Sequence, residues 1–313
     1  MRDFFICNTY NLQLITYDFM RAAFIQLHIA VFLAGITGIL GRLISVNELL
    51  IVWYRLLITV VVLWVMFVFR KQKVSISFRE FLPMVAVGGI VALHWVAFYG
   101  SIKYANVSIA LVCFSTLGFF SALLEPFLLR RKMNWVELGL GLVSLAGVAL
   151  IFHFDTRYKT GIFFGIVCAL LASLFTIFNK KLLIKHEPST ITLYELSGGF
   201  LVLNLMLPFY FKWFNLSFEM PLALDWLCLM ILAVFCTVFA FILQLNALRK
   251  ISPFTVNLTY NLEPVYGILL AFAIFNENKY LTSGFYYGLG LIGLAVLLQM
   301  VRVRLSESRM ATD

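Results

Sequence analysis

The segment "TYNLEPVYG", residues 259–267, decides the fold because it places polar groups inside a long apolar run. Glu263 carries a charge, Pro264 breaks helices, and Asn257 and Asn261 add amides, all within about two helical turns. A segment that only crossed lipid would exclude these groups, since each amide or carboxylate facing the bilayer centre costs about 2–3 kcal/mol. We therefore expect this segment to face protein or water inside a membrane-embedded bundle.

The composition supports a membrane protein. Hydrophobic residues make up 62% of the 313-residue chain and charged residues 12%, and the mean hydropathy is +0.96. Soluble domains are closer to half apolar and a quarter charged. The formal net charge of +9 comes from short basic clusters between apolar runs. We interpret these clusters as determinants of membrane topology and expect the lipid bilayer, not nucleic acid, as the partner.

Ten apolar runs have the length of about 20 residues that a helix needs to cross a ~30 Å hydrocarbon core. Short connections such as "NENK" (276–279) force neighbouring spans to be antiparallel and leave no loop for a soluble catalytic domain. The predicted spans are residues 23–43, 48–69, 81–102, 107–129, 135–152, 161–179, 190–211, 225–247, 254–275 and 281–301.

The distribution of Lys and Arg predicts the orientation. With the N-terminus inside, 17 of the 24 basic residues lie on the inner side and six on the outer side, and Arg55 lies within a span. Cytoplasmic loops carry the excess of Lys and Arg. We therefore expect a multi-pass protein of a bacterial inner membrane with both termini in the cytoplasm.

The ends of the chain and its cysteines carry few signals. Residues 1–19 have no basic segment leading into a cleavable apolar core, so we expect a short cytoplasmic tail rather than a signal peptide. A misassigned start codon before Met20 is the alternative, and residues 303–313 are the predicted C-terminal tail. The five cysteines form no CxxC or CxxH pattern, so we expect no disulfide, metal or other cofactor.

The two halves of the chain are similar in pattern. "SIKYANVSIALVCFSTLGFFSALL" (101–124) aligns without gaps with "ALRKISPFTVNLTYNLEPVYGILL" (247–270), at a shift of 146 positions. Each half contains five predicted spans, and an odd number makes the second half enter the membrane from the opposite side. Inverted repeats place a binding site at their interface near the bilayer midplane. The predicted fold is an all-α membrane protein of two inverted five-helix repeats around a central cavity.

These features together resemble the drug/metabolite transporter superfamily, EamA type, over residues 20–302. The resemblance rests on the five-plus-five layout and on "WYRLL" (53–57), "YGSIKYANVSIA" (99–110), "LNALRKISPFTVN" (245–257) and "NLEPVYGILLAF" (261–272). It implies one repeat at 20–155 and another at 156–302. It also implies a carrier of small metabolites, often amino acids and commonly outward, with a cavity lined mainly by spans 1, 3, 4, 6, 8 and 9.

Polar stripes within the spans give the candidate cavity residues. In the ninth span Asn257, Tyr260 and Asn261 share an arc with Pro264, and Glu263 borders it. Pro264 leaves a carbonyl without its helical donor, which makes it a candidate hinge. The third span offers Trp95 and Tyr99, and the fourth offers Ser115. Packing between helices, or anchoring at the interface for Tyr99, is the competing interpretation of these residues.

Further ionisable residues within the spans are candidates for a hinge or for charge coupling: Arg55, His28, His94, Glu125 and Glu195. Arg55 and Glu195 occupy similar places in the two repeats but opposite depths, so we do not expect them to pair. Proton coupling could use Glu263, Glu125 or His28, and uncoupled movement fits equally well. For His28 and His94 a neutral role between helices is the alternative.

The chain contains no GxxxxGK[ST], no HExxH and no Gly-flanked nucleophilic serine, so we do not expect an enzyme. We expect a secondary transporter that exports amino acids or related metabolites by alternating access, with a second copy of the chain as a candidate partner in a homodimer. A carrier of nucleotide sugars or phosphorylated metabolites is the alternative within transport. A non-transporting structural protein or a membrane-embedded enzyme is the alternative from another class.

Overall fold

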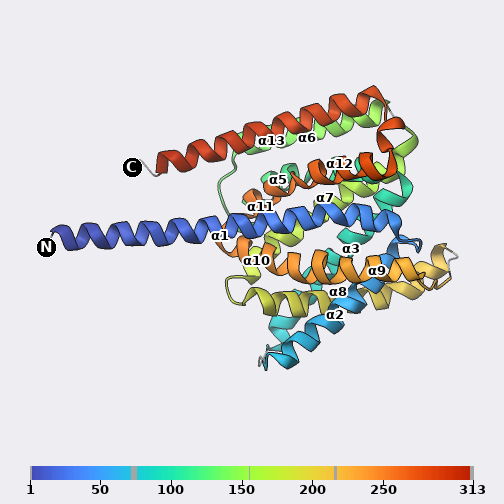
Figure 1. Cartoon of the computed structure of the whole chain (residues 1–313), viewed down its shortest axis with the longest axis horizontal. Coiled ribbons are helices and arrows are strands. Elements are labelled where there is room, and N and C mark those ends of the chain that lie inside the picture. Colours follow the sequence, from blue (N-terminus) through green and yellow to red (C-terminus); the bar gives the residue numbers. More distant parts are fainter. Residues whose placement is uncertain (1, 72–75, 155, 215–216, 311–313) are drawn as a thin grey trace.

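The computed structural model describes residues 2–71, 76–154, 156–214 and 217–310, which form helices joined by short loops (Figure 1). In this described part no strand occurs. The α-helices are α1 (Arg2–Leu43), α2 (Glu48–Phe69), α3 (Phe78–Tyr104), α4 (Val107–Phe114), α5 (Leu117–Leu129), α6 (Trp135–Phe154), α7 (Lys159–Leu182), α8 (Pro188–Phe214), α9 (Ala223–Ala233), α10 (Ala240–Lys250), α11 (Pro253–Tyr260), α12 (Glu263–Phe275) and α13 (Ser283–Met310).

The predicted spans coincide with these helices to within a few residues, apart from the ends of α1 and α13. Among the described residues, seven helical segments are long and apolar enough to cross a membrane, and Trp135–Ile151 and Glu263–Phe275 are shorter apolar helices. Two predicted spans are interrupted: α4 and α5 together form the fourth, and α11 and α12 form the ninth. In the eighth span the π-helix η2 (Val234–Phe239) separates α9 from α10.

The shift of 146 positions found in the sequence relates the helix boundaries of the two interrupted spans. It carries Val107 onto Pro253 at the starts of α4 and α11, and the first residue of α5 onto that of α12. It also carries Arg130 onto Asn276, the residues after α5 and α12, which both have left-handed backbones with φ of 54° and 55°. The chain is therefore built from two structurally repeated halves.

The interruption of the fourth span needs no proline. Pro264 lies in the first turn of α12, but the first repeat has Gly118 at the matching position. There the hydroxyl of Thr116 donates to the carbonyl of Cys113 (2.8 Å), and that of Ser115 donates to the carbonyl of Leu111 (3.2 Å). Side-chain hydroxyls that bond local carbonyls compete with the helical ladder and loosen it.

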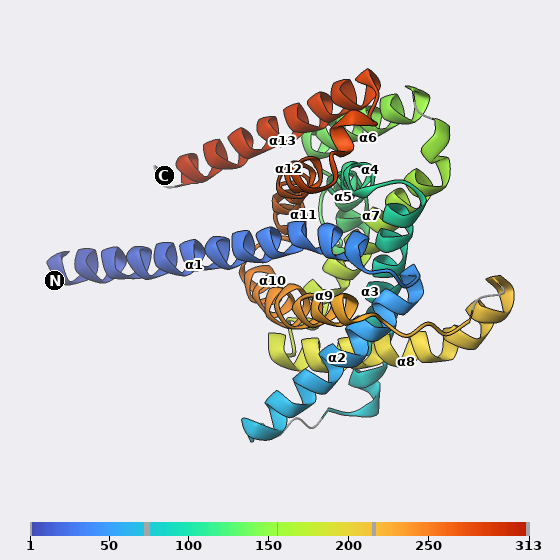
Figure 2. The ribbon, with the colours of Figure 1, turned by 45° about the vertical axis from the view of Figure 1, so that its right-hand side comes forward.

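The two halves interleave rather than lie side by side (Figure 2). Helix α3 of the first half packs against α7 and α8 of the second, α6 packs against α13, and α1 packs against α10 and α12. The interrupted helices pair in the same way, with α4 against α12 and α5 against α11. Helices of the two halves therefore pack against each other throughout the bundle.

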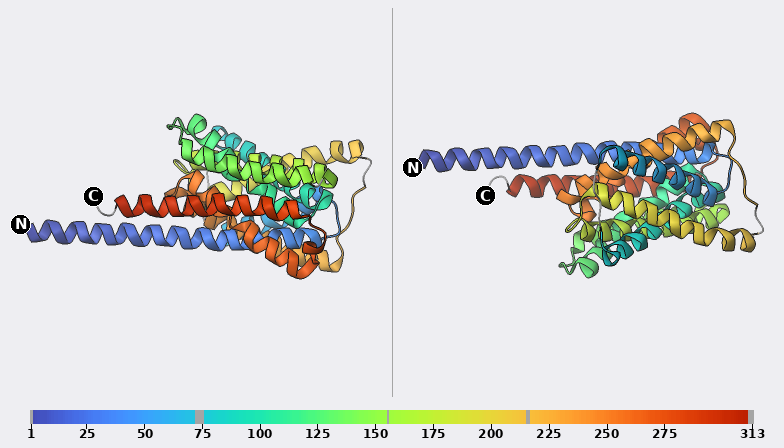
Figure 3. Two further views of the ribbon diagram at one scale, coloured as in Figure 1. Left: turned by 90° about the horizontal axis from the view of Figure 1, so that it is seen from above. Right: turned by 90° about the horizontal axis from the view of Figure 1, so that it is seen from below.

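The helices at the two ends of the chain extend past the predicted first and tenth spans. Helix α1 begins at Arg2 and continues without interruption into the first span, so the backbone of the predicted tail is helical. Its first turns extend beyond the bundle, on the same side as the end of α13 (Figure 3). Residues 311–313 of the predicted C-terminal tail lie outside the described residues.

Candidate functional site

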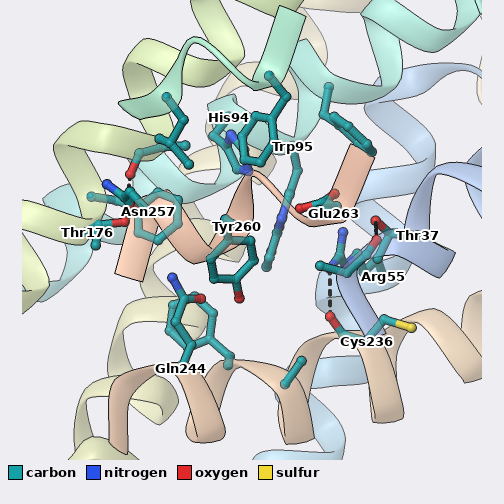
Figure 4. A pocket seen from close by; sticks show the side chains of 18 residues that line it. Thr37, Arg55, His94, Trp95, Thr176, Cys236, Gln244, Asn257, Tyr260 and Glu263 are labelled. Carbon is teal, nitrogen blue, oxygen red and sulfur yellow. Dashed lines mark hydrogen bonds between the residues drawn. The ribbon is translucent and has the colours of Figure 1, made fainter. Parts of the chain in front are cut away.

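A cavity of about 70 Å³ lies where the two interrupted spans meet (Figure 4). Its walls come from α1, α2, α3, the α4–α5 and α11–α12 junctions, α7, η2 and α10. These are the spans that the family resemblance implied, with the second span added through one residue, Arg55. Interrupted helices near the middle of a membrane expose backbone and polar groups to an enclosed space.

Arg55 is the cation of this cavity and is 2% exposed. Its Nε donates to the hydroxyl of Thr237 (2.6 Å), Nη1 donates to the hydroxyl of Tyr99 (2.9 Å), and Nη2 donates to the carbonyl of Cys236 (3.2 Å). Thr237 and Cys236 belong to η2, whose i→i+5 bonding displaces carbonyls from the α-helical ladder. The π-helix therefore supplies two of the three acceptors that fix Arg55, and α3 supplies the third through Tyr99.

Glu263 lies beside Arg55 in the lining of the cavity (Figure 4). It is 4% exposed, and among the described residues its carboxylate takes part in no hydrogen bond or ion pair. The phenol of Tyr260 and the amide of Gln244 also line the cavity without a hydrogen bond to any described residue. The Glu263 carboxylate, the Tyr260 hydroxyl and the Gln244 amide are thus available to hydrogen-bond a bound molecule.

The remaining polar lining residues are held by neighbours. Nδ1 of His94 lies 3.0 Å from the carbonyl oxygen of Cys168, while Nδ2 of Asn257 donates to the hydroxyl of Ser121 (2.6 Å). Trp95 presents its ring to the cavity beside Arg55. Predicted cavity residues Trp95, Asn257, Tyr260 and Glu263 therefore meet at one place, and His94 joins them there (Figure 4).

Three predicted cavity residues lie behind the wall instead. Tyr99 supports Arg55 through its hydroxyl and is fully buried. Ser115 bonds its own helix, and Asn261, 6% exposed, has a buried Oδ1 with no hydrogen-bond partner. A stripe of polar residues predicts the inward side of a helix, but Ser115 and Asn261 lie at the two junctions, where the regular helical spacing is interrupted.

The predicted hinge and coupling residues are spread over the molecule. Glu125, near the end of α5, accepts from the backbone amide of Phe254 and from Arg131. Glu195 is fully buried between helices, where Nδ2 of Asn179 donates to its Oε1 (3.1 Å). His28 lies on the exposed face of α1, and Pro264 begins α12. Arg55 and Glu195 do not pair.

Several lining residues escaped the sequence analysis, and they share a feature. Thr176 and Gln244 are polar groups in apolar spans. Thr176 lines the cavity together with Ala172, four positions earlier, and Gln244 does so with Phe241, three positions earlier. With spacing of three and four residues, such faces could have been recognised. Thr37 on α1 also lines the cavity.

Comparisons with known proteins agree with this architecture. A model of the EamA-like transporter family matches residues 21–153 and 159–299. An uncharacterized transporter of Archaeoglobus fulgidus is 27% identical over 237 residues, which are 72% of this chain and 79% of that protein. The uncharacterized transporter YetK of Bacillus subtilis is 25% identical over 268 residues, 82% of this chain and 80% of that one. A protein of known crystal structure that is 16% identical in sequence shares the fold, with a TM-score of 0.65. The match covers 92% of this chain and 99% of that one.

Proposed function

This chain belongs to the EamA-like transporter family, and on that premise we propose that it is a secondary transporter of amino acids or related small metabolites. In this proposal the solute occupies the cavity at the junctions of the interrupted helices and leaves by alternating access. Export across a bacterial inner membrane, with both termini cytoplasmic, is part of the proposal. It is supported by the family resemblance and by the excess of Lys and Arg on one side.

The observation that carries the solute class is the juxtaposition of Arg55 and Glu263 on one cavity. Arg55 uses three of its five N–H donors on the protein, which leaves donors for a carboxylate. Glu263 offers an unpaired carboxylate for an ammonium group. A zwitterion satisfies both, and it keeps the net charge of the occupied cavity unchanged in a medium where unpaired charge is costly.

The rest of the lining suits an apolar side chain on such a solute. Aromatic rings of Trp95, Phe98, Phe114, Phe175 and Phe241 surround the polar groups. The present volume of about 70 Å³ is well below the roughly 300–1,000 Å³ of pockets that enclose drug-sized ligands. The cavity must therefore widen when a solute enters, as alternating access requires.

Phosphorylated solutes fit this cavity less well. A phosphate needs several cationic donors, and Arg55 is the one Lys or Arg among the residues that line the cavity in the described part. The unpaired Glu263 carboxylate would repel an anion. A nucleotide sugar is accordingly the alternative outcome of the test rather than a second proposal.

Counterflow in proteoliposomes tests the solute class. Vesicles holding purified protein are loaded with one unlabelled amino acid, amine, organic acid or nucleotide sugar, and uptake of the labelled compound is followed. We expect counterflow for zwitterionic amino acids with apolar side chains and none for the corresponding amines or acids. Counterflow of nucleotide sugars alone would replace the proposed solute, and movement of no compound would favour a non-transporting protein.

A further inference from the structure

Each interrupted span begins at a carboxylate that comes from the other half of the chain. At the start of α4, Glu277 accepts from the backbone amides of Val107 (3.2 Å) and Ser108 (2.9 Å) and from the Ser108 hydroxyl (2.6 Å). At the start of α11, Glu125 accepts from the backbone amide of Phe254 (2.9 Å). A carboxylate at a helix N-terminus binds free amide hydrogens and the positive end of the helix dipole.

The two contacts are related by the repeat. Ser108 and Phe254 are separated by the same 146 positions that superimpose α4 on α11. Glu277 and Glu125 are not related by that shift, so two different positions supply carboxylates to equivalent amides. Because α4 and α11 enter the membrane from opposite sides, the two contacts lie at opposite ends of the cavity.

An arginine completes each contact. Nη1 of Arg42 lies 2.7 Å from Oε1 of Glu277, and Nη1 of Arg131 lies 3.0 Å from Oε1 of Glu125. The carboxylates are nearly buried, with 3% and 8% of their side chains exposed, whereas the arginines are 39% and 53% exposed. Water can therefore reach these groups as soon as the helices separate, and opening leaves no charge stranded in lipid.

The groups that face these carboxylates set them apart from other buried acids of the chain. Glu263 has no bonding partner in the described part, and Glu195 bonds only to the neighbouring Asn179. Asp225 also joins the halves, through Ser45, but it does so at the start of α9. Glu277 and Glu125, by contrast, join the first half of the chain to the second at the starts of the interrupted spans α4 and α11. α4 packs on α12 and α5 packs on α11, so each contact ties together one of the two helix pairs that close the cavity.

We propose that these contacts are the two gates of the transporter. The Glu277 clamp (Glu277, Arg42, Val107 and Ser108) closes one end of the cavity, and the Glu125 clamp (Glu125, Arg131 and Phe254) closes the other. Both are formed in this structure, which is therefore an occluded state. During the cycle one clamp opens at a time, and the intact clamp keeps the far end shut.

The two clamps join the two halves of the chain with different numbers of hydrogen bonds. Glu277 receives four bonds from the first half of the chain, whereas Glu125 receives one from the second half, because Arg131 belongs to its own half. The Asn257–Ser121 hydrogen bond adds a second link at the Glu125 end. The empty protein therefore opens more readily at the Glu125 end, the cytoplasmic end in the proposed orientation.

The native thiol of Cys236 allows a test that needs no solute, because Cys236 lines the cavity. The other four cysteines are replaced by alanine, and the full-length protein is placed in right-side-out and inside-out membrane vesicles. A membrane-impermeant methanethiosulfonate reagent then reports access from each side. Glu277→Gln should raise the labelling rate from one side, and Glu125→Gln from the opposite side, each on the order of tenfold.

Matched controls remove the same charge at each end without touching a clamp. Glu48, which accepts from the Tyr210 hydroxyl, is the control for Glu277, and Glu137, which pairs with Arg302, is the control for Glu125. The variants Glu48→Gln and Glu137→Gln should leave the labelling of Cys236 unchanged. If a clamp variant does not fold, Arg42→Gln or Arg131→Gln tests the same contact with a smaller shift in the same direction.

Two results would overturn the clamps: labelling that rises from the same side in both variants, or rates equal to those of the controls. The proposal rests on the proposed function, since it assumes alternating access. The two can fail separately. A protein that moves solutes yet ignores the clamp variants disproves the gates alone, whereas a Cys236 thiol that reagent reaches from neither side in any variant argues against alternating access itself.

Discussion

The guanidinium carbon of Arg55 lies 3.8 Å from the centroid of the Trp95 ring, so the cation of the cavity rests on an aromatic face. Stacking on Trp is the strongest of the cation–π arrangements, and it leaves the guanidinium edge free to bind oxygen. Together with the bonds to Tyr99, Thr237 and Cys236, it fixes the direction of every donor of Arg55. A preorganised site of this kind selects for geometry as well as charge.

Replacing Arg55 by lysine should therefore abolish most transport while keeping the positive charge. A compact ammonium cannot stack in plane on Trp95 and reach three acceptors at once. We expect counterflow to fall by about tenfold or more, as for loss of a bond to a charged group. Arg249→Lys, at an exposed ion pair with Glu187, is the matched control and should transport normally. Normal transport by Arg55→Lys would show that charge alone suffices.

Glu263→Gln should reduce transport with little loss of folded protein. The side chain has no partner among the described residues, so the amide removes a charge from the cavity without breaking a structural bond. Counterflow and the monodispersity of the detergent-solubilised protein are the measurements. Glu187→Gln, on the exposed surface, serves as control. Transport at the wild-type rate would exclude the Glu263 carboxylate from the solute site.

Glu195 should tolerate glutamine but not alanine. Oε2 of Glu195 and Oδ1 of Asn179 are both buried without partners, although Nδ2 of Asn179 already donates to Oε1. A glutamine keeps the oxygen acceptor that the Asn179 amide uses and carries no charge that would need a further partner in the buried site. Glu195→Gln should thus keep the melting temperature, whereas Glu195→Ala, which strands the Asn179 amide, should lower stability by about 1–3 kcal/mol. Equal loss in both variants would require an ionised Glu195.

The close approach of α3 and α8 predicts that adding a methyl group at Gly88 strongly destabilises the protein. A Cβ added to Gly88 would overlap the backbone carbonyl of Glu195 and lie 2.7 Å from the Gly199 nitrogen. Because both are backbone atoms, no rotamer change relieves the clash, and Gly88→Ala should destabilise by about 1–3 kcal/mol or more. Gly139→Ala, where nothing lies within 4 Å of the new Cβ, should be neutral. Thermal unfolding of both variants in detergent distinguishes them, and equal stability would contradict the packing.

The proposed orientation predicts the sidedness of introduced thiols. In a cysteine-free background, Lys71→Cys and Arg131→Cys should react with an impermeant reagent from the cytoplasmic side only, and Lys279→Cys from the outside only. All three substitutions lie at ends of spans. Labelling of position 71 from outside would reverse the topology, and the side of the membrane assigned to each clamp would then be exchanged. The two clamps would still lie at opposite ends of the cavity.

The sequence alone determined the class of protein, the positions of the helices that carry the apolar runs, and the repeat. These follow from how much of each segment lipid can solvate, which is a local property of composition and length. The pattern of "TYNLEPVYG" (259–267) predicted that Tyr260 and Glu263 share the inward side of the span, and both line the cavity, because a helix face is set by residue spacing. The shift of 146 positions appears in both the sequence and the helix boundaries.

Only the tertiary structure decided which polar residues share a site. Arg55 is brought to Glu263 because η2 unwinds locally and offers the Cys236 carbonyl, an effect that no hydropathy pattern encodes. Glu125 looks like a coupling residue in sequence, yet it caps α11 because the second half folds its helix start against it. His28 has the chemistry of a switch but lies on the exposed face of α1. Which face meets which neighbour depends on contacts between residues more than 100 positions apart, and spacing within one helix carries no information about them.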